Sequence, residues 1–157
     1  MKILTVYYSY SGNTRKIAEK IQREIGGDIA EIVTEKPYSG SYNDVVEQGQ
    51  REVNDGYKPA ILPLSKDAAE YDVIILGTPV WWYTYAPAVK TFLESVDWTE
   101  KRVYFFATNG GWIGHTSKDF EKACRGAHVA RTMNIRFDGE RQTTSNPSIE
   151  EWIRSIQ

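Results

Sequence analysis

Hydroxyl and amide side chains crowd one short segment near the start of the chain, Ser9-Tyr10-Ser11-Gly12-Asn13-Thr14. A β-rich apolar run precedes this segment, and an apolar stripe with helical spacing follows it. Backbone N–H groups and the positive end of a helix dipole therefore converge there, which favours an anion. Ser9, Ser11 and Thr14 offer hydroxyl donors and Asn13 an amide donor, and Gly12 lets the backbone approach a ligand closely. The pattern predicts a phosphate cradle, because a helix cap alone needs only one such residue.

This phosphate cradle lacks the marks of the commonest nucleotide-binding loops. A nucleotide triphosphatase loop ends in Gly-Lys-Ser or Gly-Lys-Thr, and a dinucleotide fold shows G-x-G-x-x-G after its first strand. Neither pattern occurs here. A receiver-like, phosphate-sensing module would need an acidic cluster after the first strand, where Tyr8 and Ser9 stand instead. We therefore expect a loop that holds a phosphate monoester through hydroxyl and backbone N–H groups.

A second segment, Thr78-Pro79-Val80-Trp81-Trp82-Tyr83, places three aromatic side chains next to one another. A flat, polarisable ring is held well by offset stacking on a rigid aromatic side chain. The alternative is that these rings cover a sheet edge and pack on the following helix. Because three adjacent rings cannot all point inward, we expect at least one of them to face a ligand.

A third segment, Thr108-Asn109-Gly110-Gly111-Trp112-Ile113-Gly114-His115, combines three glycines with a tryptophan. The glycines free backbone amides to face the polar edge of a ligand, while Trp112 covers its other face or rim. Glycine-rich turns also form for purely conformational reasons. His115 either relays a proton to a ligand that it faces or simply opens the next helix.

Strands and helices alternate along the chain, and each of these three segments follows a strand. Strands are predicted at 3–8, 28–33, 72–76 and 103–107 and within 129–137, and helices at 14–25, 87–96, 116–125 and 147–156, with one more helix within 42–54. Thr116 with Asp119 resembles a capping box, and Asn146 is the expected N-cap of the last helix. Such alternation requires parallel strands with helices on both faces of the sheet, and ligands then bind at the carboxyl ends of the strands.

Composition narrows the choice of partners. Nineteen basic and twenty-one acidic residues give a net charge of −2, so no global field attracts nucleic acid or an anionic membrane. The first apolar run is too short for a signal peptide or a membrane span. Cys124 is the only cysteine, which excludes an internal disulfide and leaves too few ligands for a cysteine-based metal site. Its place on an apolar helix face predicts a buried structural thiol, and a reducing cytoplasm fits.

Together, the three segments resemble the phosphate loop and the two ring-binding loops of flavodoxins, and the resemblance covers essentially the whole chain. Pro-Val-Trp-Trp followed by Pro87 resembles a small bacterial branch of flavodoxin-like proteins. The resemblance implies a single FMN-binding domain over residues 1–157, an α/β three-layer sandwich whose five-stranded parallel sheet has the order 2-1-3-4-5. It implies FMN as cofactor, no metal and no catalytic residue, with Trp81 at the stacking position. The implied FMN contacts are Ser9, Tyr10, Ser11, Gly12, Asn13, Thr14, Thr78, Pro79, Val80, Trp81, Trp82, Tyr83, Thr108, Asn109, Gly110, Gly111, Trp112 and Gly114.

The resemblance implies an electron carrier that shuttles electrons between redox partner proteins, a flavoprotein reductase and an acceptor enzyme. The alternative is an FMN-dependent NAD(P)H oxidoreductase that reduces a quinone-like small molecule. Two departures from flavodoxins bear on this choice. Residues 78–87 and 108–116 contain no acid, which favours the oxidoreductase, and residues 80–83 contain no glycine. Because a left-handed backbone is unfavourable for bulky residues, we expect weaker stabilisation of the one-electron-reduced flavin than flavodoxins show.

Overall fold

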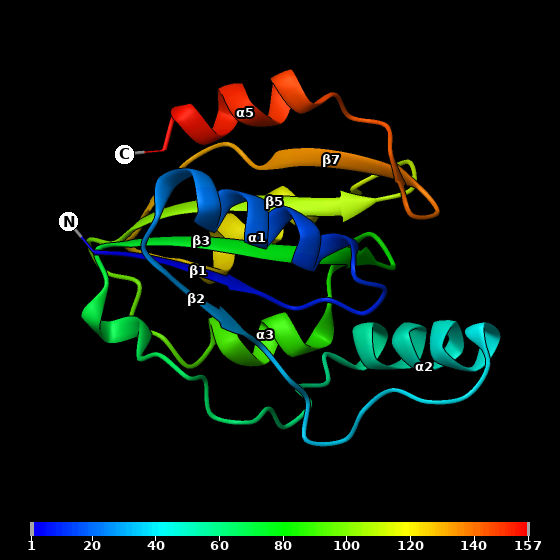
Figure 1. Cartoon of the computed structure of the whole chain (residues 1–157). Helices are drawn as coiled ribbons and strands as arrows, with labels where there is room; N and C mark the ends of the chain where they lie inside the picture. Colours follow the sequence, from blue (N-terminus) through cyan, green and yellow to red (C-terminus); the bar gives the residue numbers. More distant parts are fainter. Residues whose placement is uncertain (1, 157) are drawn as a thin grey trace.

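Five long strands form the centre of the computed structural model, which describes residues 2–156 (Figure 1). In sheet order they are β2 (Asp28–Glu31), β1 (Ile3–Tyr7), β3 (Val73–Trp81), β5 (Arg102–Asn109) and β7 (Met133–Asp138), and neighbours among them pair in parallel. Both sides of this sheet are buried, which explains the continuous apolar runs in the central strands. The strand order brings the ends of β1, β3 and β5 together at one edge.

The expected five-stranded sheet is corrected to one of eight strands in the described chain. The additional strands are β4 (Thr84–Tyr85), β6 (His128–Val129) and β8 (Arg141–Gln142). β4 and β8 fold back antiparallel on the ends of β3 and β7, and β6 pairs with the start of β5. A strand of two residues is too short to show periodicity, which is why the sequence does not reveal these three.

Helices cover both faces of the sheet, as expected. α1 (Asn13–Ile25) and α5 (Asn146–Arg154) pack on one face, and α3 (Pro87–Leu93) and α4 (Thr116–Ala123) on the other. The core on the second face includes a parallel stack of Phe105 and Phe120, with ring centroids 3.8 Å apart. A short 3₁₀ helix, Ala68–Glu70, precedes β3. None of the described helices is long and apolar enough to cross a membrane.

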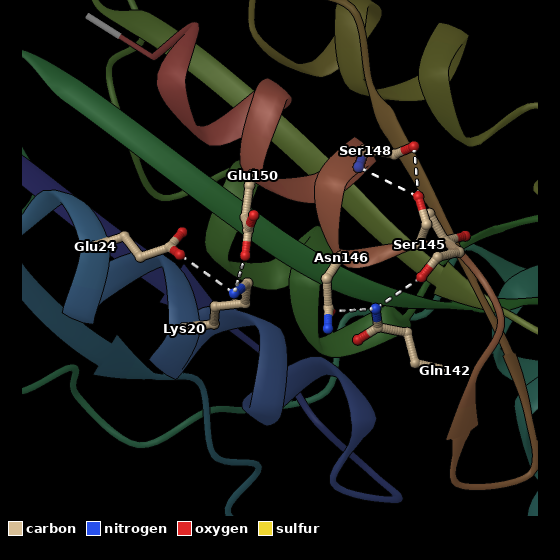
Figure 2. Close-up of polar contacts among 8 residues, drawn as sticks. Lys20, Glu24, Gln142, Ser145, Asn146, Ser148 and Glu150 are labelled. Atoms are coloured by element: carbon tan, nitrogen blue, oxygen red, sulfur yellow. Dashed lines mark hydrogen bonds and ion pairs between the residues drawn. The ribbon is translucent and has the colours of Figure 1, made fainter.

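Polar contacts join α1 to α5 and fix the start of α5 (Figure 2). The ammonium group of Lys20 lies 3.2 Å from Glu24 on its own helix and 3.3 Å from Glu150 on α5. The N-cap is Ser145, whose hydroxyl accepts the backbone N–H of Ser148, so the expected cap at Asn146 is wrong by one residue. The Asn146 side chain accepts a hydrogen bond from Gln142 instead.

The segment between β2 and β3 contains α2 (Tyr42–Asp55), which lies beyond the carboxyl ends of the strands (Figure 1). A capping box starts this helix: the Ser41 hydroxyl accepts the Asp44 N–H, and the Asp44 carboxylate accepts the Ser41 N–H. α2 contacts β3 and α3, so it is held at the same edge of the sheet as the three candidate segments.

The expected capping box at α4 is wrong. The α4 N-cap is His115, and the Thr116 hydroxyl donates to the Ile113 carbonyl instead of accepting a backbone N–H. Asp119 then stands one position too far along the helix to complete a capping box. Its carboxylate accepts hydrogen bonds from Thr84 and from the His115 ring.

Cys124 lies in the core beside α4, as the sequence predicts, and only 1% of its surface is exposed. Burial raises the pKa of the thiol to about 12, so at pH 8 only about one thiol in ten thousand is ionised. We expect no reaction with iodoacetamide at pH 8 in the folded protein and complete reaction in guanidinium chloride, measured by intact mass. Stoichiometric labelling of the folded protein would contradict the buried position.

Candidate functional site: an aromatic cavity beside the start of α1

A cavity of about 400 Å³ opens between α2, the β3–β4 turn and the loop before α4. Six of its ten lining residues are aromatic, and none carries a formal charge at neutral pH. The lining consists of Tyr10, Tyr42, Val45, Val46, Gly49, Val80, Trp81, Trp82, Tyr83 and Trp112. Trp112 is 67% exposed and Tyr42 80% exposed, so large rings stand open to solvent around the cavity. This aromatic cavity suits a planar, apolar ring.

The phosphate cradle adjoins the aromatic cavity, because Tyr10 lines the cavity and Ser11 is the next residue. The N-cap of α1 is Gly12, which has no side chain to cap the helix and has a φ of 102°. A Cβ added at Gly12 would meet no atom within 4 Å, so open space lies in front of the helix end. The Ser9 hydroxyl accepts the N–H groups of Gly12 and Arg15, at 3.1 and 3.3 Å.

Asn13 leaves a buried polar atom unpaired at the same helix end. Its side-chain nitrogen donates to the Gly139 carbonyl at 2.9 Å, but its Oδ1 is buried and has no partner among the described residues. A buried acceptor without a donor is unfavourable. The open helix end and this unpaired oxygen together fit a phosphate-bearing ligand that also carries hydroxyl groups.

The side chains of Thr14 and Arg15 already have polar partners outside the cradle. The hydroxyls of Thr14 and Thr108 are buried and share a hydrogen bond of 2.7 Å, which ties the cradle to the end of β5. Arg15 forms an ion pair with Glu31 on β2. The cradle therefore offers mainly backbone N–H groups and the exposed Ser11 hydroxyl.

The second candidate segment is a β-hairpin. β3 continues to Trp81, which pairs with Thr84 across a two-residue turn. The turn residues Trp82 and Tyr83 have φ values of 49° and 72°. Asn-Gly is the favoured sequence for such a turn, and a left-handed conformation costs about 1–2 kcal/mol for each non-glycine residue. Two bulky residues thus adopt a left-handed backbone here, and the expected weaker stabilisation of the one-electron-reduced flavin stays a prediction.

Contacts outside the hairpin hold this turn, residues 81–84, which we name the aromatic turn. Trp81 lies edge-on against Tyr38 at 4.9 Å between ring centroids, and the Trp82 indole N–H donates to the Val46 carbonyl at 3.0 Å. The Tyr83 carbonyl accepts the His115 N–H at 2.8 Å, and the Thr84 hydroxyl donates to Asp119. Four consecutive residues are thus anchored to other parts of the chain, which is how a strained backbone persists.

The structure brings most of the predicted segments to the aromatic cavity but gives some of their residues structural roles. Thr78 is buried, and its hydroxyl donates to the Pro79 carbonyl and accepts the Ala86 N–H. Asn109 folds its own loop, since its side chain accepts the Gly111 N–H and donates to Asn134. Neither residue lines the cavity.

His115 lies behind the aromatic turn. It lines a separate cavity of about 270 Å³ together with Asp119 and Lys90, and it does not line the aromatic cavity. A proton relay from His115 to a ring in the aromatic cavity therefore lacks a direct path. Within residues 2–156, no group of three His, Cys, Asp or Glu side chains is placed to hold a metal ion.

The sequence does not identify α2 as a wall of the site. The sequence does indicate an uncharged face on this helix, because the spacing of one helix face is shared by Tyr42, Val45, Val46 and Gly49. The sequence does not show what this face of α2 packs against, because the contact with the aromatic turn joins residues far apart in the chain. The Trp82–Val46 hydrogen bond is one such contact.

The family model described as Flavodoxin matches residues 2–156. The chain belongs to the flavodoxin family. Among curated relatives, it is 28% identical to the flavodoxin of Haemophilus influenzae and 26% identical to flavodoxin 1 of Escherichia coli, each over 111 residues. These matches cover 68% of this chain and 49% of each relative, so the chain spans about half the length of the curated relatives it matches.

Solved structures that are similar to this chain include flavoproteins. A candidate flavoprotein from Bacteroides eggerthii is 30% identical, with a TM-score of 0.80, and the match covers 99% of this chain and 97% of the other. A flavoprotein from Lactobacillus acidophilus in complex with FMN is 28% identical, with a TM-score of 0.74, and 85% and 92% of the two chains are covered. Flavodoxins bind a flavin, so membership of this family supports a flavin cofactor.

The loop before α4 supports the aromatic turn through Gly114, and a pair of glycine substitutions tests this contact. A Cβ at Gly114 would lie 2.4 Å from both Cβ and the carbonyl oxygen of Tyr83, and Gly114 has a φ of 59°. We expect Gly114→Ala to lower the free energy of unfolding by about 1–3 kcal/mol in urea titrations. The control is Gly111→Ala, whose Cβ would meet nothing within 4 Å and should change stability by less than about 0.5 kcal/mol. Equal stability of the two variants would contradict the contact.

Proposed function

We propose that the chain is a single FMN-binding domain that transfers electrons between redox partner proteins. The observation that carries the proposal is the junction at Tyr10 and Ser11. Tyr10 lines a cavity suited to a planar ring, and Ser11 directly precedes Gly12, the N-cap of α1, at a helix end suited to a phosphate. FMN carries a ring and a phosphate joined by a short chain of hydroxyl-bearing carbons, so one molecule satisfies both places.

The residues of the cradle bind the phosphate end in this proposal. The N–H groups of Gly12 and Arg15 already donate to Ser9, so the backbone N–H groups of Asn13 and Thr14 would bind the phosphate in the positive field of the helix end, and the Ser11 hydroxyl would add a donor. Asn13 Oδ1 accepts a hydrogen bond from a hydroxyl of the ribityl chain, which satisfies the unpaired atom. The glycine at position 12 leaves the space that the phosphate needs.

The residues of the aromatic cavity bind and orient the ring. Aromatic side chains exclude water from its faces, and the anchored turn supplies a wall of fixed shape. Bound FMN supplies the ability to take up and release one or two electrons. The exposed rings of Tyr83 and Trp112 border the mouth of the cavity, where a redox partner approaches.

One observation favours the second candidate, an FMN-dependent NAD(P)H:quinone oxidoreductase. The lining of the aromatic cavity contains no charged residue, and α2 adds Val45 and Val46 as a further apolar wall. Such a surface accommodates a flat, uncharged acceptor beside the flavin. A carrier that only meets proteins does not need an apolar wall beside the flavin.

The cradle is tested by Ser11→Ala, because the exposed Ser11 hydroxyl makes no hydrogen bond among the described residues. Loss of a hydrogen bond to the phosphate should raise the Kd for FMN by about tenfold, and the Kd for riboflavin, which lacks the phosphate, should not change. Flavin fluorescence quenching measures both constants. Ser65→Ala is the control, because Ser65 is exposed and does not line the aromatic cavity, and this variant should bind both flavins as the wild type does. An equal loss of affinity for FMN and riboflavin in Ser11→Ala would place the phosphate elsewhere.

Steady-state oxidation of NAD(P)H separates the two candidate functions. For a carrier, the FMN-loaded protein alone should not oxidise NAD(P)H in the presence of a quinone, and its flavin should be reduced only when a flavoprotein reductase is added. Turnover by the purified protein with a quinone would refute the carrier and support the oxidoreductase. Loss of absorbance at 340 nm measures both reactions.

A further inference from the structure

We propose that Asp119 is a positioning residue that holds the aromatic turn in its left-handed conformation, the shape in which the turn meets the flavin. The proposal rests on the proposed FMN site for its functional meaning, but the positioning itself is a property of the chain without flavin. Asp119 belongs to α4 and does not line the aromatic cavity. It would act on the flavin only through the residues that it holds.

One carboxylate oxygen binds both sides of the strained turn. Asp119 Oδ2 lies 2.5 Å from the Thr84 hydroxyl and 2.5 Å from His115 Nδ1. Thr84 directly follows Tyr83, and the backbone N–H of His115 donates to the Tyr83 carbonyl at 2.8 Å. Tyr83, at a φ of 72°, is therefore fixed between two residues that share one anchor.

The hairpin cannot supply this restraint by itself. Only two residue pairs join its strands, Val80 with Tyr85 and Trp81 with Thr84. A left-handed backbone is unfavourable at two bulky residues, so a ladder of two pairs leaves the turn dependent on contacts from outside the hairpin. The hydrogen bonds to a carboxylate are the stronger kind, and the Thr84 end is buried, where water competes poorly.

Other charged groups near Asp119 do not compete with Thr84 and His115 for its carboxylate. Glu52 and Lys90 line the same small cavity, but within residues 2–156 the side-chain partners of the Asp119 carboxylate are Thr84 and His115. Glu52 accepts hydrogen bonds from Tyr38 and Gln48. Asp119 also does not cap its own helix, since α4 starts at His115 without a side-chain cap. The carboxylate therefore binds Thr84, which follows Tyr83 in the chain, and His115, whose backbone N–H donates to the Tyr83 carbonyl.

Hydrogen exchange of the full chain without flavin tests the positioning directly. In Asp119→Ala, the His115 backbone N–H and the Trp82 indole N–H should exchange at least tenfold faster than in the wild type. Backbone N–H groups of the β3–β5 ladder should keep their wild-type rates. Glu121→Ala, an exposed carboxylate on the same helix, is the control and should exchange like the wild type. Unchanged rates at His115 and Trp82 in Asp119→Ala would overturn the proposal.

A second substitution decides the matter if Asp119→Ala unfolds. Thr84→Val removes the hydroxyl and keeps the side-chain shape, so the same local acceleration is expected, whereas Thr84→Ser keeps the hydroxyl and should restore protection. Equal exchange in the valine and serine variants would overturn the proposal.

Flavin affinity then tests the functional consequence. Because Asp119 acts on the ring wall and leaves the cradle intact, Asp119→Ala should raise the Kd values for FMN and riboflavin by the same factor, about tenfold. A change confined to FMN, or no change in either Kd, would overturn the link to the flavin. If the wild-type chain bound neither flavin, the proposed function would fail while the exchange result would still decide the positioning role.

Discussion

The left-handed turn at Trp82 and Tyr83 is the constraint on which the wall of the aromatic cavity depends. Its residues disfavour the conformation, so the turn exists only because surrounding elements hold it. The Trp82 indole donates a hydrogen bond to α2, and the loop before α4 donates one to the Tyr83 carbonyl. The Thr84 hydroxyl donates to Asp119. α2, the loop before α4 and α4 therefore all contact the same turn. The position of α2 beyond the sheet and the shape of the aromatic cavity follow from this arrangement.

Local patterns in the sequence predict a large part of this structure. The cradle and α1 follow from hydroxyl-rich residues placed between a strand and a helical stripe, and Ser41 with Asp44 predicts the start of α2. The parallel order of the long strands follows from their alternation with helices. The signals for the cradle, α1 and α2 each lie within about ten consecutive residues, whereas the alternation that predicts parallel strands runs along the whole chain.

The features that the sequence does not predict depend on partners far away in the chain. The left-handed backbone at Trp82 and Tyr83 opposes local preference, and its anchors at Val46 and Asp119 lie about 35 residues to either side. Asp119 illustrates the same difficulty, because its spacing from Thr116 resembles a capping box while its actual partners are Thr84 and His115. A polar residue near a helix start indicates a hydrogen bond without identifying its partner.

The buried hydrogen bond between Thr14 and Thr108 has a consequence for how the protein acquires its binding site. These residues are 94 positions apart and belong to the ends of α1 and β5. Because β3 lies between β1 and β5 in the sheet, the two hydroxyls meet only after β3 has paired with both neighbours. A contact of such long sequence separation forms late, once loop-closure entropy has been overcome. The cradle sequence, residues 9–14, is therefore complete in the nascent chain before the Thr14–Thr108 contact that ties it to β5 has formed.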